Sequence, residues 1–427
     1  MRISVVAGMA SLVGLFLLGP ACSSSSGGSG FGSSSGSSGG SSNGSSGGSS
    51  SSGGGSGGSS SGLLGDGGSG GDGGFLCAPN PGNYEVPGNG CDDDGDGMVD
   101  NVVVCDQGLM AAGTAHDMAA AMGICQDAAG AKWGIVSATY TQGYGGGAPN
   151  DGQHGILTKF GGTLVPKEGS NLGVLSSGFG REWDDLQGAY NNDCGNPFTQ
   201  TSASCFKGPQ MPMTGMGTAP PGYPKGSTAC PQMAGVVQDA ISLTLQIKVP
   251  LNAQGFQFDF DFFSGEWPEY VCTPFNDSFV AWLQSAAFTG NPPNSGDLNI
   301  SFDAKNNPVS VNNGFFESCT MNASTGCCAS QGMGGCGSPT GTATCMNGTA
   351  ELAGTGFDDM GTYCGSASTG GGATGWLTTK APAKPGEVMT LKLIIWDTGD
   401  YNWDSSVIMD HFTWIQGPTM TGTSPAQ

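Results

Sequence analysis

Alternation of apolar and polar residues predicts short β-strands along most of the chain after residue 105. In residues 256–262 every second position is Phe, and the positions between them are Gln257, Asp259 and Asp261. A period of two is expected for a strand with one buried face. Residues 241–249 show the same period, with Ile, Leu and Val alternating with Ser, Thr, Gln and Lys.

Further short apolar runs lie at residues 132–140, 162–166, 278–283, 298–303, 387–397 and 405–415. Each run is bounded by Gly, Pro, Asn or Asp, which favour turns. Many short strands separated by turn signals are typical of a β-sandwich. We therefore expect a mainly β fold: an antiparallel, jelly-roll-like β-sandwich with one short packing helix and long disulfide-bonded loops.

The helix is predicted from about Gly108 to Asp127, a region rich in Ala and Met. Its larger apolar residues fall near one stripe at helical spacing: Leu109, Ala112, Met118, Met122 and Cys125. We expect this stripe to pack on the sandwich. His116 is expected to be a surface residue or a hydrogen-bonded one rather than a metal ligand.

Residues 1–21 have the character of a secretory signal peptide. Arg2 precedes an apolar run from Val5 to Leu18, and small residues then lead to Cys22. The run is too short to span a membrane as a helix. The segment resembles a bacterial lipoprotein signal, in which the cysteine at the cleavage site is acylated. We expect a lipid anchor on Cys22 in the outer membrane of a Gram-negative bacterium; the alternative is ordinary secretion, with an incidental cysteine.

Three further parts are expected after the signal peptide. Residues 22–74 are the acylated cysteine and a tether, because the sequence from Ser23 to Gly62 is Ser and Gly apart from two residues. Such a composition cannot bury enough apolar surface to fold. Residues 75–105 form an aspartate-rich segment, and residues 106–427 form the sandwich domain.

The charge and the cysteines narrow the class of protein. The net charge is −22, with only 12 Lys and Arg, so a nucleic acid partner is not expected. Of 15 cysteines, 14 remain after Cys22, an even number that favours disulfides in an exported chain. Six of them fall in residues 319–364, which we expect to be stapled by disulfides. The three histidines are scattered, which disfavours zinc.

The sequence GCDDDGDGMVDN predicts a calcium loop. Its acids stand at positions one, three, five and nine of a calcium-loop pattern, namely Asp92, Asp94, Asp96 and Asp100, and Gly97 allows the bend. Position twelve is Val103 rather than Glu, so the loop is not an EF-hand. It resembles shorter aspartate-rich loops of bacterial surface repeats. A Cys91–Cys105 bridge would clamp it, and the alternative is a solvated acidic turn.

A second acidic stretch, residues 264–279, contains Glu266, Glu269 and Asp277 among bulky apolar residues. These acids are candidates for a second calcium site, for loop carboxylates that accept backbone N–H groups, or for a glycosidase pair of Glu266 and Glu269. No catalytic residue is expected, because no triad or metalloprotease motif accompanies them. Another acidic run has the same alternatives: Asp397, Asp400, Asp404 and Asp410.

The stretch DFFSGEWPEYVCTPFNDSFVAWL resembles the core motif of the choice-of-anchor L family of bacterial surface proteins. Trp267 stands where the family pattern has Tyr, and the matching positions are Glu266, Pro268, Glu269, Tyr270, Val271, Phe275, Asn276, Asp277 and Phe279. Further segments fit in order over most of residues 106–416. The resemblance implies attachment to the cell surface by one of several devices. It implies no particular biochemical activity.

Together these features predict a non-catalytic, adhesion-type binding or structural module, anchored by lipid and displayed on the cell surface. Calcium is the expected cofactor. The expected partners are the membrane, through the anchor, and a surface polysaccharide or protein. The alternative is a secreted carbohydrate-active hydrolase that uses Glu266 and Glu269.

Overall fold

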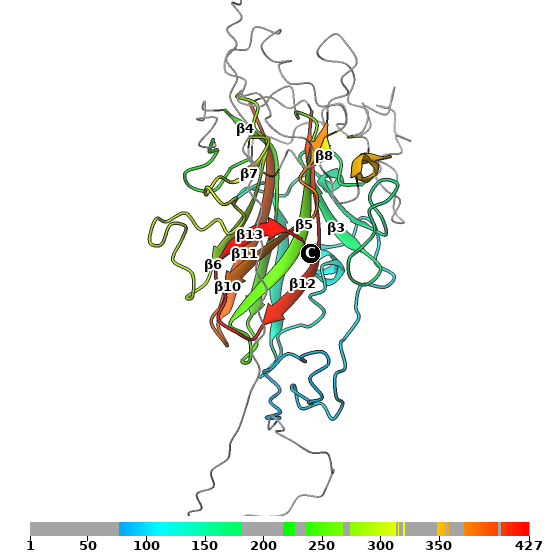
Figure 1. The fold of residues 1–427 in the computed structure, drawn as a ribbon, viewed down its shortest axis with the longest axis vertical. Helices are drawn as coiled ribbons and strands as arrows, with labels where there is room; N and C mark the ends of the chain where they lie inside the picture. Colours follow the sequence, from blue (N-terminus) through cyan, green and yellow to red (C-terminus); the bar gives the residue numbers. More distant parts are fainter. Residues whose placement is uncertain are drawn as a thin grey trace, which may run out of the picture. The chain divides into compact units, whose positions relative to one another are not determined.

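The computed structural model describes residues 77–181, 217–226, 235–267, 274–312, 315, 319–320, 348–355, 357, 371–399 and 403–426. Within these ranges the named strands pair antiparallel and form two sheets that face each other (Figure 1). The expected mainly β, antiparallel two-sheet fold is therefore confirmed. The signal peptide, Cys22 and the tether lie outside the described residues.

One sheet has the strand order β1-β4-β11-β6-β7. Its strands are β1 (Gly134–Thr141), β4 (Val237–Lys248), β11 (Val388–Thr398), β6 (Ser278–Gln284) and β7 (Val309–Ser310). The other sheet has the order β13-β10-β5-β12-β3-β2, with β9 added on β5 and β8 on β9. Its strands are β13 (Gly422–Pro425), β10 (Leu377–Pro382), β5 (Gly255–Ser264), β12 (Ser405–Ile415), β3 (Leu172–Ser176), β2 (His154–Leu157), β9 (Gly372–Ala373) and β8 (Cys319–Thr320).

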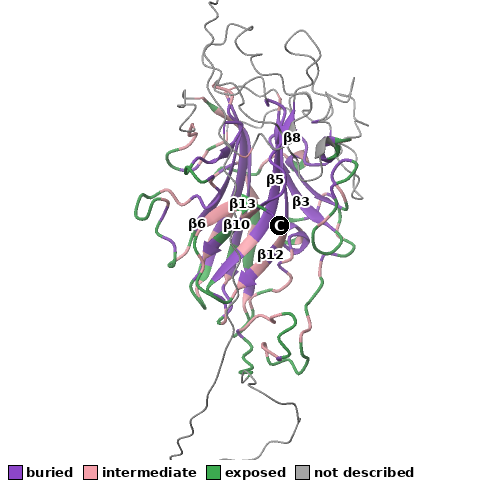
Figure 2. Cartoon of the chain, in the orientation of Figure 1, coloured by how far each residue is buried: buried purple, intermediate pink, exposed green. Residues whose placement is uncertain are grey.

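The core lies between the sheets and is built by the predicted alternation. The Phe residues at 256, 258, 260 and 262 of β5 are fully buried in one cluster with alternate residues of β4 and β11. Figure 2 shows buried residues along the length of β5 and β12. Because alternate positions of facing sheets interdigitate, the two-residue period fixes which side chains meet.

The prediction that β5 has only one buried face is wrong. Asp259 and Asp261 are buried as well, at 4% and 0% exposure. A second apolar cluster covers this outer face, with Phe263 of β5 packed against Phe160 and Phe357. The sequence pattern could not show this covering layer, because its residues come from loops distant in sequence.

Helix α1 is Ala115–Ala121, shorter than the predicted span from Gly108 to Asp127. Thr114 begins it with a capping box, since its side chain accepts the N–H of Asp117 while the Asp117 carboxylate accepts the N–H of Thr114. The helix ends at Ala121 with Met122 as its C-cap, and Gly123 follows at φ 94°. Met118 and Met122 are buried in the core, as the stripe predicted. His116 is exposed and contacts Asp127 at 2.7 Å.

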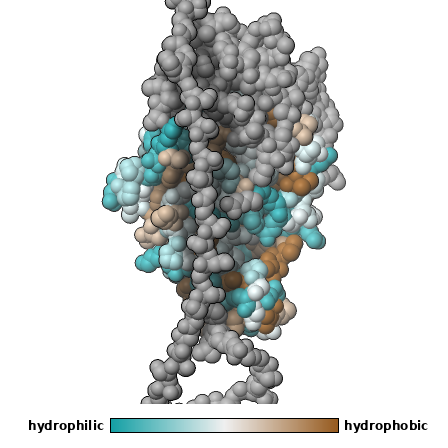
Figure 3. Space-filling view, viewed as in Figure 1, coloured by the Kyte–Doolittle hydropathy of each residue, from teal (hydrophilic) through white to brown (hydrophobic). Residues whose placement is uncertain are grey.

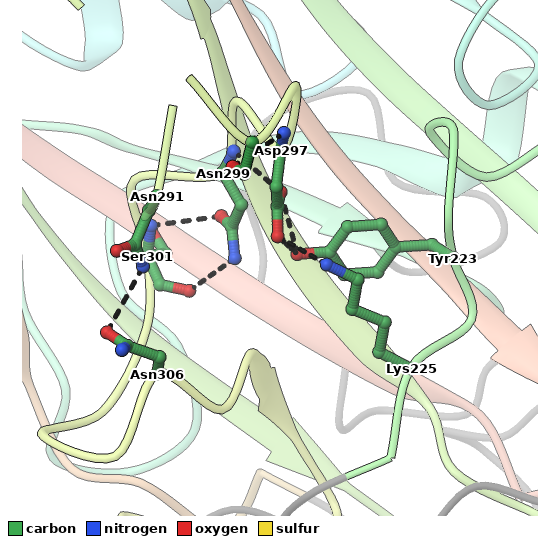
Figure 4. A network of polar contacts seen from close by, with 8 residues as sticks. Tyr223, Lys225, Asn291, Asp297, Asn299, Ser301 and Asn306 are labelled. Atoms are coloured by element: carbon green, nitrogen blue, oxygen red, sulfur yellow. Dashed lines mark hydrogen bonds and ion pairs between the residues drawn. The ribbon is translucent and has the colours of Figure 1, made fainter. Parts of the chain in front are cut away.

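Residues 217–226, which precede β4, and the loop after β6 cover the outer face of the five-stranded sheet. Tyr223 packs edge-on against Trp282 and Trp396 of that sheet, and its hydroxyl donates to Asp297. Lys225 forms an ion pair with the same carboxylate. Figure 4 shows this network continuing through Asn299, Ser301, Asn291 and Asn306. The contacts fix residues 291–306 and serve a structural role.

Two disulfides flank the aspartate-rich segment: Cys77–Cys91 and Cys105–Cys125. The predicted Cys91–Cys105 bridge is therefore wrong. Each cysteine pairs with a residue outside the loop, at Cα separations of 5.4 Å and 5.3 Å, so the segment is tied at both ends rather than closed on itself. Apart from Cys319 in β8, the cysteines of residues 319–364 lie outside the described residues, and their stapling stays a prediction.

We expect the double variant Cys105→Ala, Cys125→Ala to lower the free energy of unfolding by about 3 kcal/mol, because the bridge closes a loop of 20 residues. Denaturant unfolding under oxidising conditions measures this change. The matched control is Cys77→Ala, Cys91→Ala, which should loosen the aspartate-rich segment and change unfolding of the sandwich less. Equal losses in both variants would contradict the assignment of Cys105–Cys125 as the bridge that supports the sandwich.

Candidate functional site

The aspartate-rich loop is held in shape by its own carboxylates. Asp92 accepts N–H groups from Gly95, Asp96 and Gly97 at 2.7 to 3.1 Å. Asp96 accepts the N–H of Met98 at 2.8 Å. Two glycines at positive φ, Gly95 and Gly97, permit the tight turns.

The structure brings together some of the predicted calcium ligands and adds one. Carboxylate oxygens of Glu85, Asp92 and Asp94 lie within 4.8 Å of one another. The Asp100 carboxylate instead accepts the N–H groups of residues 89 and 90, and Asp96 binds the Asn101 side chain. Glu85 lies outside the loop pattern, so the spacing that pointed to the aspartates could not identify it.

A largely apolar cavity of about 270 Å³ adjoins this group of acids. Its aromatic lining comes from Tyr84, Trp133, Phe412 and Trp414. Glu85 and Asp94 line it too. Trp133 and Trp414 meet edge to face, with ring centroids 5.8 Å apart. The indole N–H of Trp414 has no acceptor among the described residues. The apolar surface in Figure 3 gathers toward the lower right, the side on which Figure 1 draws the N-terminal part of the described chain.

A second group of acids lies buried at one end of the core, where the inward-facing apolar residues stop. Three strands of the five-stranded sheet each carry an aspartate two positions beyond the last such residue: Asp239 at β4, Asp277 at β6 and Asp397 at β11. From the other sheet, Glu266 follows Ser264 at the end of β5. Acids from both sheets therefore converge on the same space.

The predicted residues Glu266 and Asp277 meet here, together with Asp397. Their carboxylate oxygens lie within 4.8 Å of one another, and all three residues are at most 1% exposed. Asp277 is oriented by the N–H of Thr398 at 3.0 Å and the hydroxyl of Ser405 at 2.5 Å. Glu269 and Asp400 lie outside the described residues.

Burial and mutual repulsion dominate the electrostatics of this group. Burial, followed by the charges of Asp277, Glu266 and Asp404, raises the pKa of Asp397 well above its usual range. Burial and the charge of Asp277 raise the pKa of Asp239 to about 7. Both effects disfavour the ionised form, so in the absence of a cation this end of the core retains protons.

Asp410, from the same acidic run as Asp397, has a structural role. One oxygen of its carboxylate accepts the N–H groups of Lys167 and Glu168 at 2.6 and 3.1 Å. This is the predicted alternative in which a loop acid fixes a turn. Glu266 does not present an open face for a glycosidase, since it is 1% exposed, and a catalytic carboxyl must contact the sugar.

Chelator-treated protein should lose stability as the pH rises from 5 to 8. The folded state keeps Asp239 protonated up to a pKa of about 7, whereas the unfolded chain releases this proton at about pH 4. The resulting stabilisation is fully present below pH 4 and lost as the pH rises through 7, by at most about 4 kcal/mol.

Thermal unfolding across this pH range measures the decline. Asp239→Asn, which cannot ionise, should flatten it, and an equal slope in wild type and variant would contradict the assignment. His154 acts in the opposite sense, because burial lowers its pKa to about 4 and its contribution is lost only as the pH falls below 6.5. The contribution of His154 is the same in wild type and in Asp239→Asn, so it cancels when the two pH slopes are compared.

Comparison with known proteins finds a family model that matches part of the chain. Residues 227–413 match the sequence model of the choice-of-anchor L domain. Curated proteins and solved structures gave no match. Among the described residues no helix is long and apolar enough to cross a membrane. The matched range holds β4, β5, β6, β11 and the buried acids between them. The chain therefore carries a choice-of-anchor L domain at residues 227–413, a kind of domain that suggests association with the cell surface.

Proposed function

We propose that this protein is a lipid-anchored, adhesion-type binding module displayed on the outer membrane. The observation that carries the proposal is the choice-of-anchor L domain at residues 227–413, in a chain whose sequence begins with a lipoprotein-like signal ending at Cys22. The family match supports surface association. The signal and Cys22 support a lipid as the device that provides it.

The ligand-binding part of the proposal rests on the cavity beside the aspartate-rich loop. Walls of indole and phenol rings and flanking carboxylates suit a sugar ring, which has apolar faces and hydroxyl groups. Calcium at Glu85, Asp92 and Asp94 would neutralise the acids on one side of this cavity. Hard oxygen ligands and partial exposure fit an extracellular calcium site of weak affinity. We therefore propose a cell-surface polysaccharide as the ligand.

Replacing Cys22 should release the protein from the membrane. The variant Cys22→Ser lacks the thiol that carries the acyl chains, so it should appear as soluble protein or as an uncleaved precursor. Membrane fractionation and N-terminal mass determination measure this result. Cys319→Ser is a control that leaves the signal intact. A Cys22→Ser protein that is processed and still membrane-bound would contradict the lipid anchor.

Binding to isolated cell-surface polysaccharide should depend on both the cavity and calcium. Trp133→Ala removes part of the aromatic wall and should weaken binding at least about tenfold, since one stacking aromatic contributes on the order of 1–3 kcal/mol. Asp92→Asn together with Asp94→Asn should abolish the calcium dependence of binding. Calorimetry with and without chelator measures both effects.

Asp127→Asn is the matched control for the loop variants, because Asp127 is an exposed acid outside the cavity. Hydrolysis products in the same reaction mixtures would favour the hydrolase alternative instead. Wild-type binding by Trp133→Ala would show that the ligand does not occupy this cavity.

A further inference from the structure

We infer that the end of the sandwich core holds a structural divalent cation, coordinated by the carboxylates of Glu266, Asp277 and Asp397. The choice-of-anchor L match assigns no metal to these residues, and the inference is independent of the proposed ligand cavity. It rests on two observations: acids from both sheets converge, and the Asp397 carboxylate is buried without an N–H or hydroxyl donor among the described residues.

Convergence is the first argument. Glu266 follows a strand of the eight-stranded sheet. Asp277 immediately precedes β6, and Asp397 lies in the neighbouring strand β11 of the five-stranded sheet. Their carboxylate oxygens lie within 4.8 Å of one another. Oxygens that bind one cation at 2.3–2.6 Å are at most about 5 Å apart, so a single ion between the three is geometrically possible.

The Asp397 side chain is the second, independent argument. It is 0% exposed, and among the described residues no N–H or hydroxyl group donates to either of its carboxylate oxygens; its side-chain contact is with the carboxyl group of Asp277. Buried carboxylates are normally satisfied by N–H groups, hydroxyls or cations, because an isolated buried charge is very costly. A buried carboxylate whose neighbours are other acids rather than N–H or hydroxyl donors has the environment of a metal ligand.

The local backbone supports this arrangement. The pairing of β11 with β4 shifts register between Ile395 and Asp397, opposite Asp239, which adopts a positive φ of 43°. Bulges redirect side chains at the ends of sheets, and a left-handed aspartate costs free energy that the surroundings must offset. The irregularity places a fourth buried acid beside Asp277.

The donor set selects the kind of ion. All three ligands are carboxylate oxygens, which hard cations prefer, and the described part of the chain adds no Cys or His to the group. Calcium accepts an irregular shell of six to eight oxygens, whereas magnesium requires a near-ideal octahedron. A calcium ion here would join the two sheets at one end of the core. Its role would be structural, because the ligands are buried.

The experiment uses the full-length mature protein. Metal analysis after gel filtration in metal-free buffer should find calcium retained at about one ion per chain. Chelation should lower the unfolding midpoint by on the order of 10 °C, and added calcium should restore it. The double variant Asp92→Asn, Asp94→Asn should retain this ion and this shift, because it alters only the exposed loop.

Asp397→Asn is the direct test, since the amide keeps the shape of the side chain but removes a charge from the site. It should lose the retained ion, and its unfolding midpoint should no longer respond to calcium. The inference is overturned if wild-type protein retains no divalent metal and its midpoint does not respond to calcium, magnesium or manganese. It is equally overturned if Asp397→Asn retains the ion and the shift. Because the first outcome needs only wild-type protein, a variant that fails to fold leaves the test intact.

Discussion

The burial of several carboxylates at one end of an otherwise apolar core is the constraint on which the rest of the fold depends. Alternate side chains of β4, β6 and β11 fill the space between the sheets with Ile, Leu and Phe, and at one end they give way to aspartates. Water would normally solvate these charges, but the facing sheet, with Glu266, occupies that side. The sheets can close there only if protons or a cation neutralise the acids.

Much of the fold could be predicted because its signals are local. The alternation at residues 241–249 and 256–262 depends only on neighbouring residues, and it correctly identified β4, β5 and the core face. The buried outer face of β5 could not be predicted, since Phe160 and Phe357 reach it from separate loops. The predicted disulfide pairing was wrong for the same reason, because nothing near Cys91 or Cys105 in the sequence indicates which other cysteine is its partner.

The candidate sites show the same division between local and non-local information. Spacing within the aspartate-rich loop pointed to Asp92 and Asp94, but Glu85 joins them only through the turn that precedes Cys91. In the buried group, Glu266 and Asp277 belong to one recognisable motif, whereas Asp397 lies 120 residues further along the chain and meets them through the pairing of β11 with β6. Extending the inward-facing period of each strand by one more step would have identified it.

The two groups of acids differ in what a cation could do for each. At the loop the carboxylates are partly exposed and already accept backbone N–H groups, so these hydrogen bonds hold the turn without an ion. Calcium there would mainly neutralise the carboxylate charge beside the cavity. At the core no N–H or hydroxyl group of the described residues donates to the Asp397 carboxylate, and the surrounding apolar side chains do not screen its charge. A ligand stabilises a protein when it binds the folded state more tightly than the unfolded chain. The buried group exists only when the sheets are closed, and it is therefore the site at which an ion would contribute most to stability.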